Sequence, residues 1–127
     1  MRGLVLLIAA LFAATLVPLA AISQGSQAES QRENRKCDVG PVNKTYGGTE
    51  WLVYSCDDGR TVALVSAPGN PAMPFVFMFY ERENAYRLYG EGAGKKEVTA
   101  AAFDELKALS KAEIAALIEQ TKLSNRK

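Results

Sequence analysis

The residues with the clearest chemical potential lie together in the stretch "WLVYSCDDGRTVALV", from Trp51 to Val65. In this stretch Cys56 is followed by Asp57 and Asp58, and β-branched and aromatic residues lie on both sides. A thiolate beside carboxylates can act as a nucleophile or a metal ligand. In an oxidising compartment the same cysteine would instead form a disulfide. The rest of the chain decides between these interpretations.

The chain contains no histidine, which removes the usual general base of a Ser-His-Asp or Cys-His site. Zinc sites lose their common imidazole ligand, and two cysteines cannot supply a four-thiolate site. The second cysteine is Cys37. We therefore expect a disulfide between Cys37 and Cys56, no cofactor and no catalytic activity.

The alternative hypothesis for the function rests on carboxylate side chains. A disulfide would bring Cys37 and Cys56 within about 6 Å at Cα, and with them Asp38, Asp57 and Asp58. Several carboxylate oxygens are what Ca²⁺ requires, and paired carboxylates serve acid–base hydrolysis. A calcium-binding protein or a small carboxylate-dependent hydrolase is therefore the alternative function. No EF-hand spacing is present, and turn formation alone accounts for the two adjacent aspartates.

Residues 1–23 have the layout of a secretory signal peptide. Arg2 precedes an apolar run from Leu4 to Val17, and the small residues Ala21 and Ser23 follow. The run is shorter than the roughly 20 residues that span a bilayer. We expect cleavage, only transient contact with the membrane during export, and a final location in the periplasm or outside the cell. An uncleaved anchor is the alternative.

Cleavage after Ser23 would leave 104 residues, enough for one small domain. It would also remove Arg2, leaving 14 basic against 14 acidic residues. A neutral chain lacks the basic face that nucleic-acid binding needs. Residues 24–36 are mostly polar and contain no aromatic or β-branched residue, which predicts a flexible linker. Residues 37–127 are then a single domain.

Runs of β-branched and aromatic residues between turn signals predict four or five antiparallel strands. The predicted strands are Val42–Tyr46, Trp51–Cys56, Thr61–Val65, Phe75–Tyr80 and Tyr86–Tyr89. Asp58-Gly59 predicts a two-residue type I′ hairpin loop. The run "FVFMFY" is apolar at alternate positions of both faces, which predicts a central strand covered on both sides.

The last third of the chain changes to helical spacing. Apolar residues recur from Ala102 to Leu109, and Ser110 to Glu113 form a capping-box pattern ahead of a second apolar stripe. Two short helices meeting near Ser110 are predicted, and they would cover one face of the sheet. The fold class is therefore α+β, a β-meander followed by two C-terminal helices and braced by one disulfide.

The stretch "YSCDDG", Tyr54 to Gly59, resembles the Tyr-x-Cys-Asp-Gly strand end of small periplasmic inhibitors of C-type lysozyme. The resemblance covers six of 127 residues. The later Ser-Gly and Trp-x-Lys-Gly segments of that family have no counterpart here, and the predicted helices depart from its all-β barrel. No functional residue is carried over.

Aromatic residues supply the candidate binding surface. Two short helices cover only one sheet face, and the other is either exposed or covered by residues 37–50 with the proline-rich loop Ser66–Pro74. Exposed aromatic area marks contact sites. The candidate residues are Tyr46, Trp51, Met73, Tyr80, Tyr86 and Tyr89. We predict a non-enzymatic binding protein, such as an inhibitor, an immunity-type protein or an envelope accessory, whose partner is a protein or a small apolar ligand.

Overall fold

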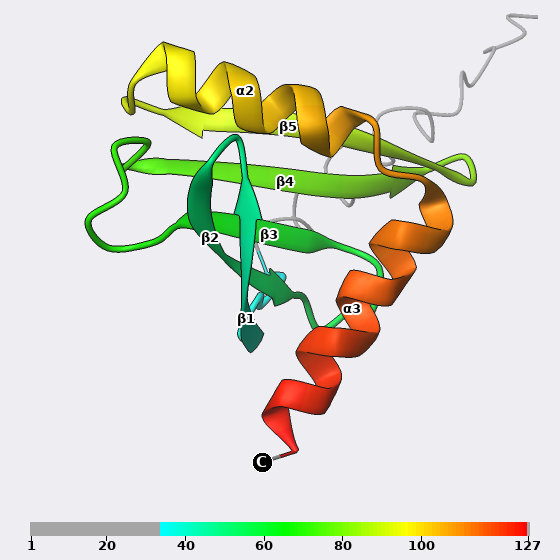
Figure 1. The fold of residues 1–127 in the computed structure, drawn as a ribbon. Coiled ribbons are helices and arrows are strands. Elements are labelled where there is room, and N and C mark those ends of the chain that lie inside the picture. The colour runs from blue at the N-terminus through cyan, green and yellow to red at the C-terminus, as the bar shows by residue number, and fades with distance from the viewer. Residues whose placement is uncertain (1–33, 127) are drawn as a thin grey trace, which may run out of the picture. The chain divides into compact units, whose positions relative to one another are not determined.

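The computed structural model describes residues 34–126 of the protein. Five strands form one antiparallel sheet in chain order, and two helices follow (Figure 1). The elements are β1 (Val39–Tyr46), β2 (Thr49–Ser55), β3 (Val62–Ser66), β4 (Phe75–Arg82), β5 (Ala85–Gly92), α2 (Lys96–Lys107) and α3 (Lys111–Asn125). The predicted α+β meander with two C-terminal helices is confirmed. The predicted signal peptide lies outside the described residues.

Two tight hairpins keep the outer strands in register. Gly47 and Gly48 join β1 to β2 with φ of 63° and 77°, a conformation that glycine adopts without strain. Glu83 and Asn84 join β4 to β5 with φ of 52° and 65°. Positive φ at both positions is the signature of a type I′ loop, whose twist matches that of the flanking strands.

The connection between β2 and β3 differs from the prediction. Ser55 pairs with Val62, so six residues separate the strands instead of the expected two at Asp58 and Gly59. Asp58 Oδ1 accepts hydrogen bonds at 2.9 Å from the two amides that follow Gly59, including that of Thr61. The aspartate side chain satisfies the loop backbone in place of cross-strand bonds, and this makes the longer turn stable.

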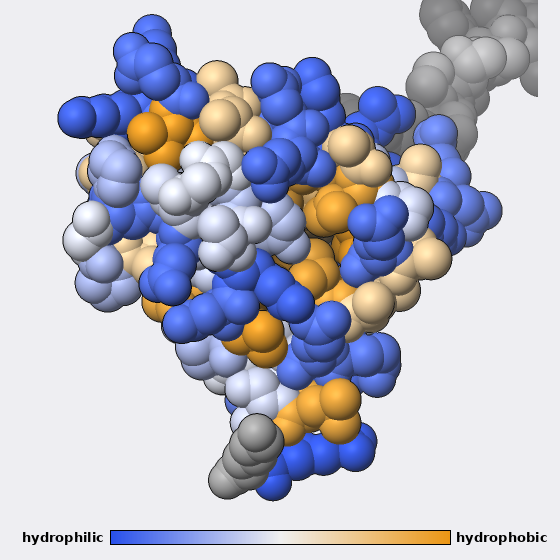
Figure 2. Space-filling view, viewed as in Figure 1, coloured by the Kyte–Doolittle hydropathy of each residue, from blue (hydrophilic) through white to orange (hydrophobic). Residues whose placement is uncertain are grey.

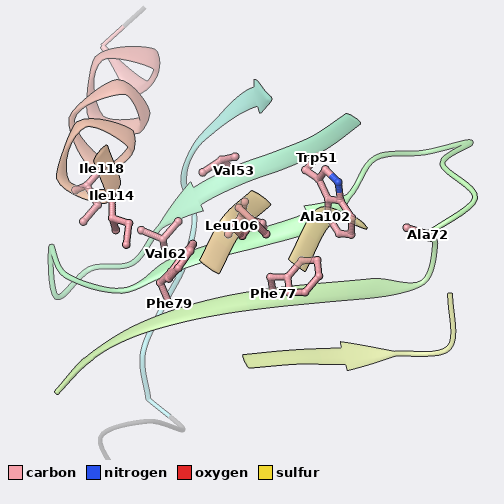
Figure 3. Packing of buried hydrophobic residues seen from close by; sticks show 11 residues of the cluster. Trp51, Val53, Val62, Ala72, Phe77, Phe79, Ala102, Leu106, Ile114 and Ile118 are labelled. Atoms are coloured by element: carbon pink, nitrogen blue, oxygen red, sulfur yellow. The ribbon is translucent and has the colours of Figure 1, made fainter. Parts of the chain in front are cut away.

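The core lies between one face of the sheet and the two helices (Figure 3). Its buried residues are Trp51, Val53, Val62, Leu64, Ala72, Phe77, Phe79, Ala102, Leu106, Ile114 and Ile118. The rings of Trp51 and Phe77 pack at 5.1 Å between centroids. Near the C-terminus, Ser55 Oγ and Thr121 Oγ1 form a buried hydrogen bond of 2.7 Å that ties β2 to α3.

Local sequence determines where the helices begin and how closely they approach the sheet. The predicted capping box is confirmed: Ser110 Oγ accepts from the Glu113 amide at 3.1 Å, and Glu113 Oε1 accepts from the Ser110 amide at 3.4 Å. Helix α2 packs on the β1–β2 hairpin, where a Cβ on Gly47 would lie 2.5 Å from the backbone nitrogen of Ala102. Gly47 is therefore required by this close approach as well as by its positive φ.

The opposite side of the sheet, here called the open face, has no second layer of secondary structure in the described part of the chain. Residues 39–46 form β1 within the same sheet, so they do not build the alternative covering layer. The expectation that β4 is covered on both sides is also wrong, because Val76, Met78 and Tyr80 alternate with the buried phenylalanines and stay partly exposed. The open face consists of Leu52, Tyr54, Ala63, Val65, Val76, Met78, Tyr80 and Tyr89.

Candidate binding surface and the disulfide clasp

The predicted disulfide between Cys37 and Cys56 is confirmed. Cys56 is 2% exposed, and neither cysteine of the chain is free. The Lys36 carbonyl accepts a hydrogen bond of 2.8 Å from the Asp57 amide beside the bridge. The disulfide and this backbone hydrogen bond, here called the clasp, therefore hold the segment before β1 against the β2–β3 loop. Because both cysteines are in the bridge, neither can act as a thiolate.

An ion pair extends this clasp by one more residue on each side. Arg35 Nε lies 2.8 Å from Asp58 Oδ2, with both side chains less than a fifth exposed. Thr61 Oγ1 donates to the same oxygen at 2.6 Å. Burial alone raises the pKa of Asp58, but the bonds from Thr61 and Arg60 and the charge of Arg35 together bring it below the ordinary value. The ion pair thus ties Arg35, two residues before the disulfide, to the β2–β3 loop.

The Asp58 carboxylate should make stability depend on acid pH. A carboxyl whose folded pKa is lowered stabilises the fold above its unfolded pKa of about 4, and the contribution disappears as pH falls through the lower folded value. We expect Asp58→Asn to cost about 1 kcal/mol at pH 7 and progressively less below pH ~4. Melting temperatures of the two proteins from pH 7 to pH 2 check this. A difference in melting temperature between the two proteins that stays constant down to pH 2 would contradict this prediction.

The weak metal candidates are not brought together as a site. Among residues 34–126, no group of three or more His, Cys, Asp or Glu side chains could hold a metal ion. Asp58 is engaged by Arg35 and Thr61, and Asp57 Oδ1 accepts from the Lys36 amide at 3.3 Å. Asp38 is exposed beside the bridge. The two loop aspartates serve the clasp and the turn.

The structure divides the six predicted surface residues between the two sides of the sheet. Trp51 is fully buried on the helix side, so its assignment to the surface is wrong. Its Nε1 donates to the Tyr46 carbonyl at 3.1 Å, which satisfies the one polar group of the indole. Tyr46 and Tyr86 are half-buried on the same side, and burial, followed by nearby carboxylates, raises the pKa of both phenols. These three residues belong to the core or its margin.

The other three residues do remain accessible. Tyr80 and Tyr89 lie on the open face with ring centroids 5.6 Å apart, and Tyr89 is 50% exposed. Met73 is 54% exposed in the proline-rich loop, where it borders an apolar hollow of about 340 Å³ with Val65 and Val76. The exposed part of the predicted surface therefore coincides with the open face and its margin.

Cross-strand register builds the open face into continuous rows. One row runs Leu52, Val65, Val76 across β2, β3 and β4. The next row runs Tyr54, Ala63, Met78, Tyr89 across β2 to β5. Sequence analysis missed six of these residues. Their signal was the alternation with core residues, but both alternating sets are apolar, so alternation did not show which set faces outward.

Arg35 joins the clasp to the open face. Its guanidinium lies 5.6 Å from the centroid of the Tyr80 ring, within the range of a cation–π contact, while its Nε binds Asp58. This places a positive charge at one margin of an otherwise apolar surface. On β5, the exposed side chains of Arg87 and Glu91 form a second, mixed-charge margin.

A groove lies on the other side of the sheet, next to β5. Figure 2 shows apolar residues gathered in the angle between α2 and α3, and the groove there has a volume of about 460 Å³. Tyr86, Leu88, Phe103, Lys107 and Leu109 contribute to its lining. Phe103 is 38% exposed, and Lys107 Nζ lies 5.7 Å from its ring centroid. The groove borders β5, the last strand of the sheet.

No protein-family model, curated protein or solved structure matches the chain. Within residues 34–126, neither helix has the length and apolar character needed to cross a membrane.

Proposed function

We propose that this chain is an exported, disulfide-braced binding protein without catalytic activity, and that its open face docks onto another protein. The observation that carries the proposal is the apolar face left without a covering layer by the described fold. Apolar surface of this kind, bearing aromatic side chains, is typical of contact sites between proteins.

The shape of the open face favours a protein over a small ligand. Its two rows run across β2, β3 and β4, and the second continues to Tyr89 on β5. Small-molecule sites are concave and enclose most of the ligand, whereas a broad sheet surface fits a complementary surface of similar extent. Charges lie at the margins, at Arg35, Arg87 and Glu91, so we expect an apolar partner surface with charged groups at its rim.

Export is supported by two independent features. Residues 1–23 have the charge, apolar run and small-residue exit of a signal peptide. Disulfides such as Cys37–Cys56 are typical of oxidising compartments and rare in the cytosol. A disulfide-bridged domain of about 100 residues suits a location where glutathione and thioredoxin do not keep thiols reduced.

Site-specific photo-crosslinking in the native host tests the proposal. We expect Tyr89→p-benzoylphenylalanine to give a discrete adduct with one protein, because Tyr89 is half exposed at the centre of β5. The matched control is Leu123→p-benzoylphenylalanine, since Leu123 is 57% exposed but lies on α3. Excess unmodified protein should suppress the adduct, whereas Met78→Glu, which places a charge in the middle of the open face, should not.

Three results would contradict the proposal. They are equal adducts from both positions, an adduct of Tyr89 only with residues 24–33 of the same chain, and full competition by Met78→Glu. If Met78→Glu fails to fold, Val65→Glu replaces it, because Val65 is 37% exposed on the same face.

A further inference from the structure

The two edges of the sheet are protected to very different degrees. On β1, Pro41 removes one backbone donor, and the register shifts between Val39 and Val42. Helix α3 also covers this edge: Ser124 Oγ donates to the Pro41 carbonyl at 3.0 Å, and Asn125 Oδ1 accepts from the Gly40 amide at 3.1 Å. Proline, a bulge and a covering helix are the usual devices that prevent strand addition. The β1 edge is therefore closed.

The β5 edge has neither a proline nor a bulge, and α2 lies along β5 on the helix side of the sheet (Figure 1). Its eight residues contain no proline, and their pairing with β4 is continuous from Ala85 to Gly92. Within the described residues β5 has no other strand neighbour. An edge strand of this length with unpaired backbone groups is a template for a further strand.

The hairpin register shows which backbone groups of β5 are available. The Ala93 amide donates to the Pro74 carbonyl at 3.0 Å, in continuation of the β4–β5 register. In an antiparallel strand, alternate residues direct their N–H and C=O to the same neighbour, so odd-numbered residues of β5 face β4. The backbone N–H and C=O groups of Tyr86, Leu88 and Gly90 therefore point away from β4, toward the free edge of the sheet.

We propose that two copies of this chain pair through β5 in antiparallel orientation, centred on Tyr89. In this register Leu88 exchanges backbone hydrogen bonds with Gly90 of the second copy. Arg87 then lies opposite Glu91 of the second copy, twice by symmetry, and the two Tyr89 rings meet. The Arg87–Glu91 and Tyr89–Tyr89 pairs are non-hydrogen-bonded pairs, the kind in which cross-strand side chains approach most closely.

The charges of Arg87 and Glu91 favour this register over registers centred on the residues next to Tyr89. Centring the pair on Arg87 or on Glu91 would place like charges opposite each other, and centring it on Leu88 or Gly90 would leave Arg87 and Glu91 unmatched. Neither residue forms an ion pair within residues 34–126, so both are available. A surface that complements itself under a two-fold axis is what a symmetric dimer requires.

The groove beside β5 gives the second copy an apolar contact. Its lining includes Leu88 of β5 and the exposed Phe103 of α2, so it borders the strand that would bind the incoming strand. The strand of the second copy would cover part of this lining. The pairing also places Tyr89, a residue of the open face, on the two-fold axis. A Tyr89 crosslink to a second copy of the chain would therefore report this pairing, whereas a crosslink to a different protein would report a partner of the open face.

Charge reversal at the β5 edge tests the pairing in the exported protein. Sedimentation measurements should show a concentration-dependent dimer of the unmodified chain. Arg87→Glu should weaken the dimer at least about tenfold, because two attractive pairs become repulsive. The double variant Arg87→Glu/Glu91→Arg should return to within about threefold of the unmodified chain. Arg82→Glu is the matched control, since Arg82 lies outside the paired segment, and it should leave dimerisation unchanged.

Hydrogen exchange supplies a second measurement. The amides of Leu88 and Gly90 should exchange more slowly as the protein concentration rises. An unmodified chain that remains monomeric at about 1 mM would overturn the proposal, as would a dimer that Arg87→Glu and Arg82→Glu affect equally. A double variant as weak as the single one would overturn the register centred on Tyr89.

Discussion

Trp51→Ala should lower the free energy of unfolding by about 4 kcal/mol, the largest effect we expect from one substitution. The indole is fully buried, packs against Phe75 and Phe77 at 6.4 and 5.1 Å between centroids, and donates to the Tyr46 carbonyl. Truncation would leave a cavity in the centre of the sheet. Urea denaturation monitored by circular dichroism measures the loss, because the substitution removes the only tryptophan fluorophore.

Met73→Ala is the control for this substitution. Met73 is a large apolar residue that is 54% exposed, and we expect a change within about 0.5 kcal/mol. A small domain has about 5–15 kcal/mol of stability, so the tryptophan variant would be close to the limit of folding at 37 °C. If Trp51→Ala lowered the free energy of unfolding by less than 1 kcal/mol, the result would contradict this packing and indicate that Trp51 is exposed.

Removing both cysteines, as Cys37→Ala/Cys56→Ala, should cost about 3 kcal/mol. The bridge closes a loop with a sequence separation of 19, and constraint of the unfolded chain accounts for most of a loss of this size in the chain-entropy model. The Lys36–Asp57 backbone bond and the Arg35–Asp58 pair would lose the anchor beside them. Thermal melting without reductant measures the effect on the double variant.

Two comparisons isolate the contribution of the bridge. Reductant should lower the melting temperature of the unmodified protein toward that of the double variant, and it should leave the double variant unchanged. Arg35→Gln removes the neighbouring ion pair but keeps the bridge, and we expect it to cost about 1 kcal/mol or less. Equal stability of the double variant and the unmodified protein would show that the clasp does not brace the domain.

The order of the elements could be predicted from sequence because local signals were sufficient. Gly47-Gly48 separates two β-rich runs, and Ser110 with Glu113 marks a helix start by a reciprocal pair of hydrogen bonds. The disulfide followed from the count of two cysteines and the signal-peptide pattern. Each of these inferences needs residues that are close in sequence or unique in the chain.

The assignment of sheet faces could not be predicted in the same way. In Trp51 to Tyr54 and in Phe75 to Tyr80 both alternating sets are apolar, and a change of one residue in register exchanges the two faces. The choice depends on contacts with Ala102 and Leu106, about fifty residues after Trp51 in the chain. The surface role predicted for Trp51 failed for this reason.

The β2–β3 loop shows a second limit. Asp58-Gly59 carries the composition of a two-residue turn, but the Asp58 side chain binds the following amides and Arg35. The ion pair comes from a residue 23 positions earlier, next to the disulfide. Turn propensity is local, so it could not include a contact that the clasp creates.

Solvent exposure of matched valine methyl groups tests the central claim, that the helices cover one face of the sheet and leave the other open. Val53 and Val62 are buried on the helix side, and Val65 and Val76 lie on the open face. In NMR spectra of the protein with a soluble gadolinium chelate, we predict strong broadening of the Val65 and Val76 methyl signals and little broadening of those of Val53 and Val62. Equal protection of all four valines would mean that a further layer covers the open face, and it would contradict the account.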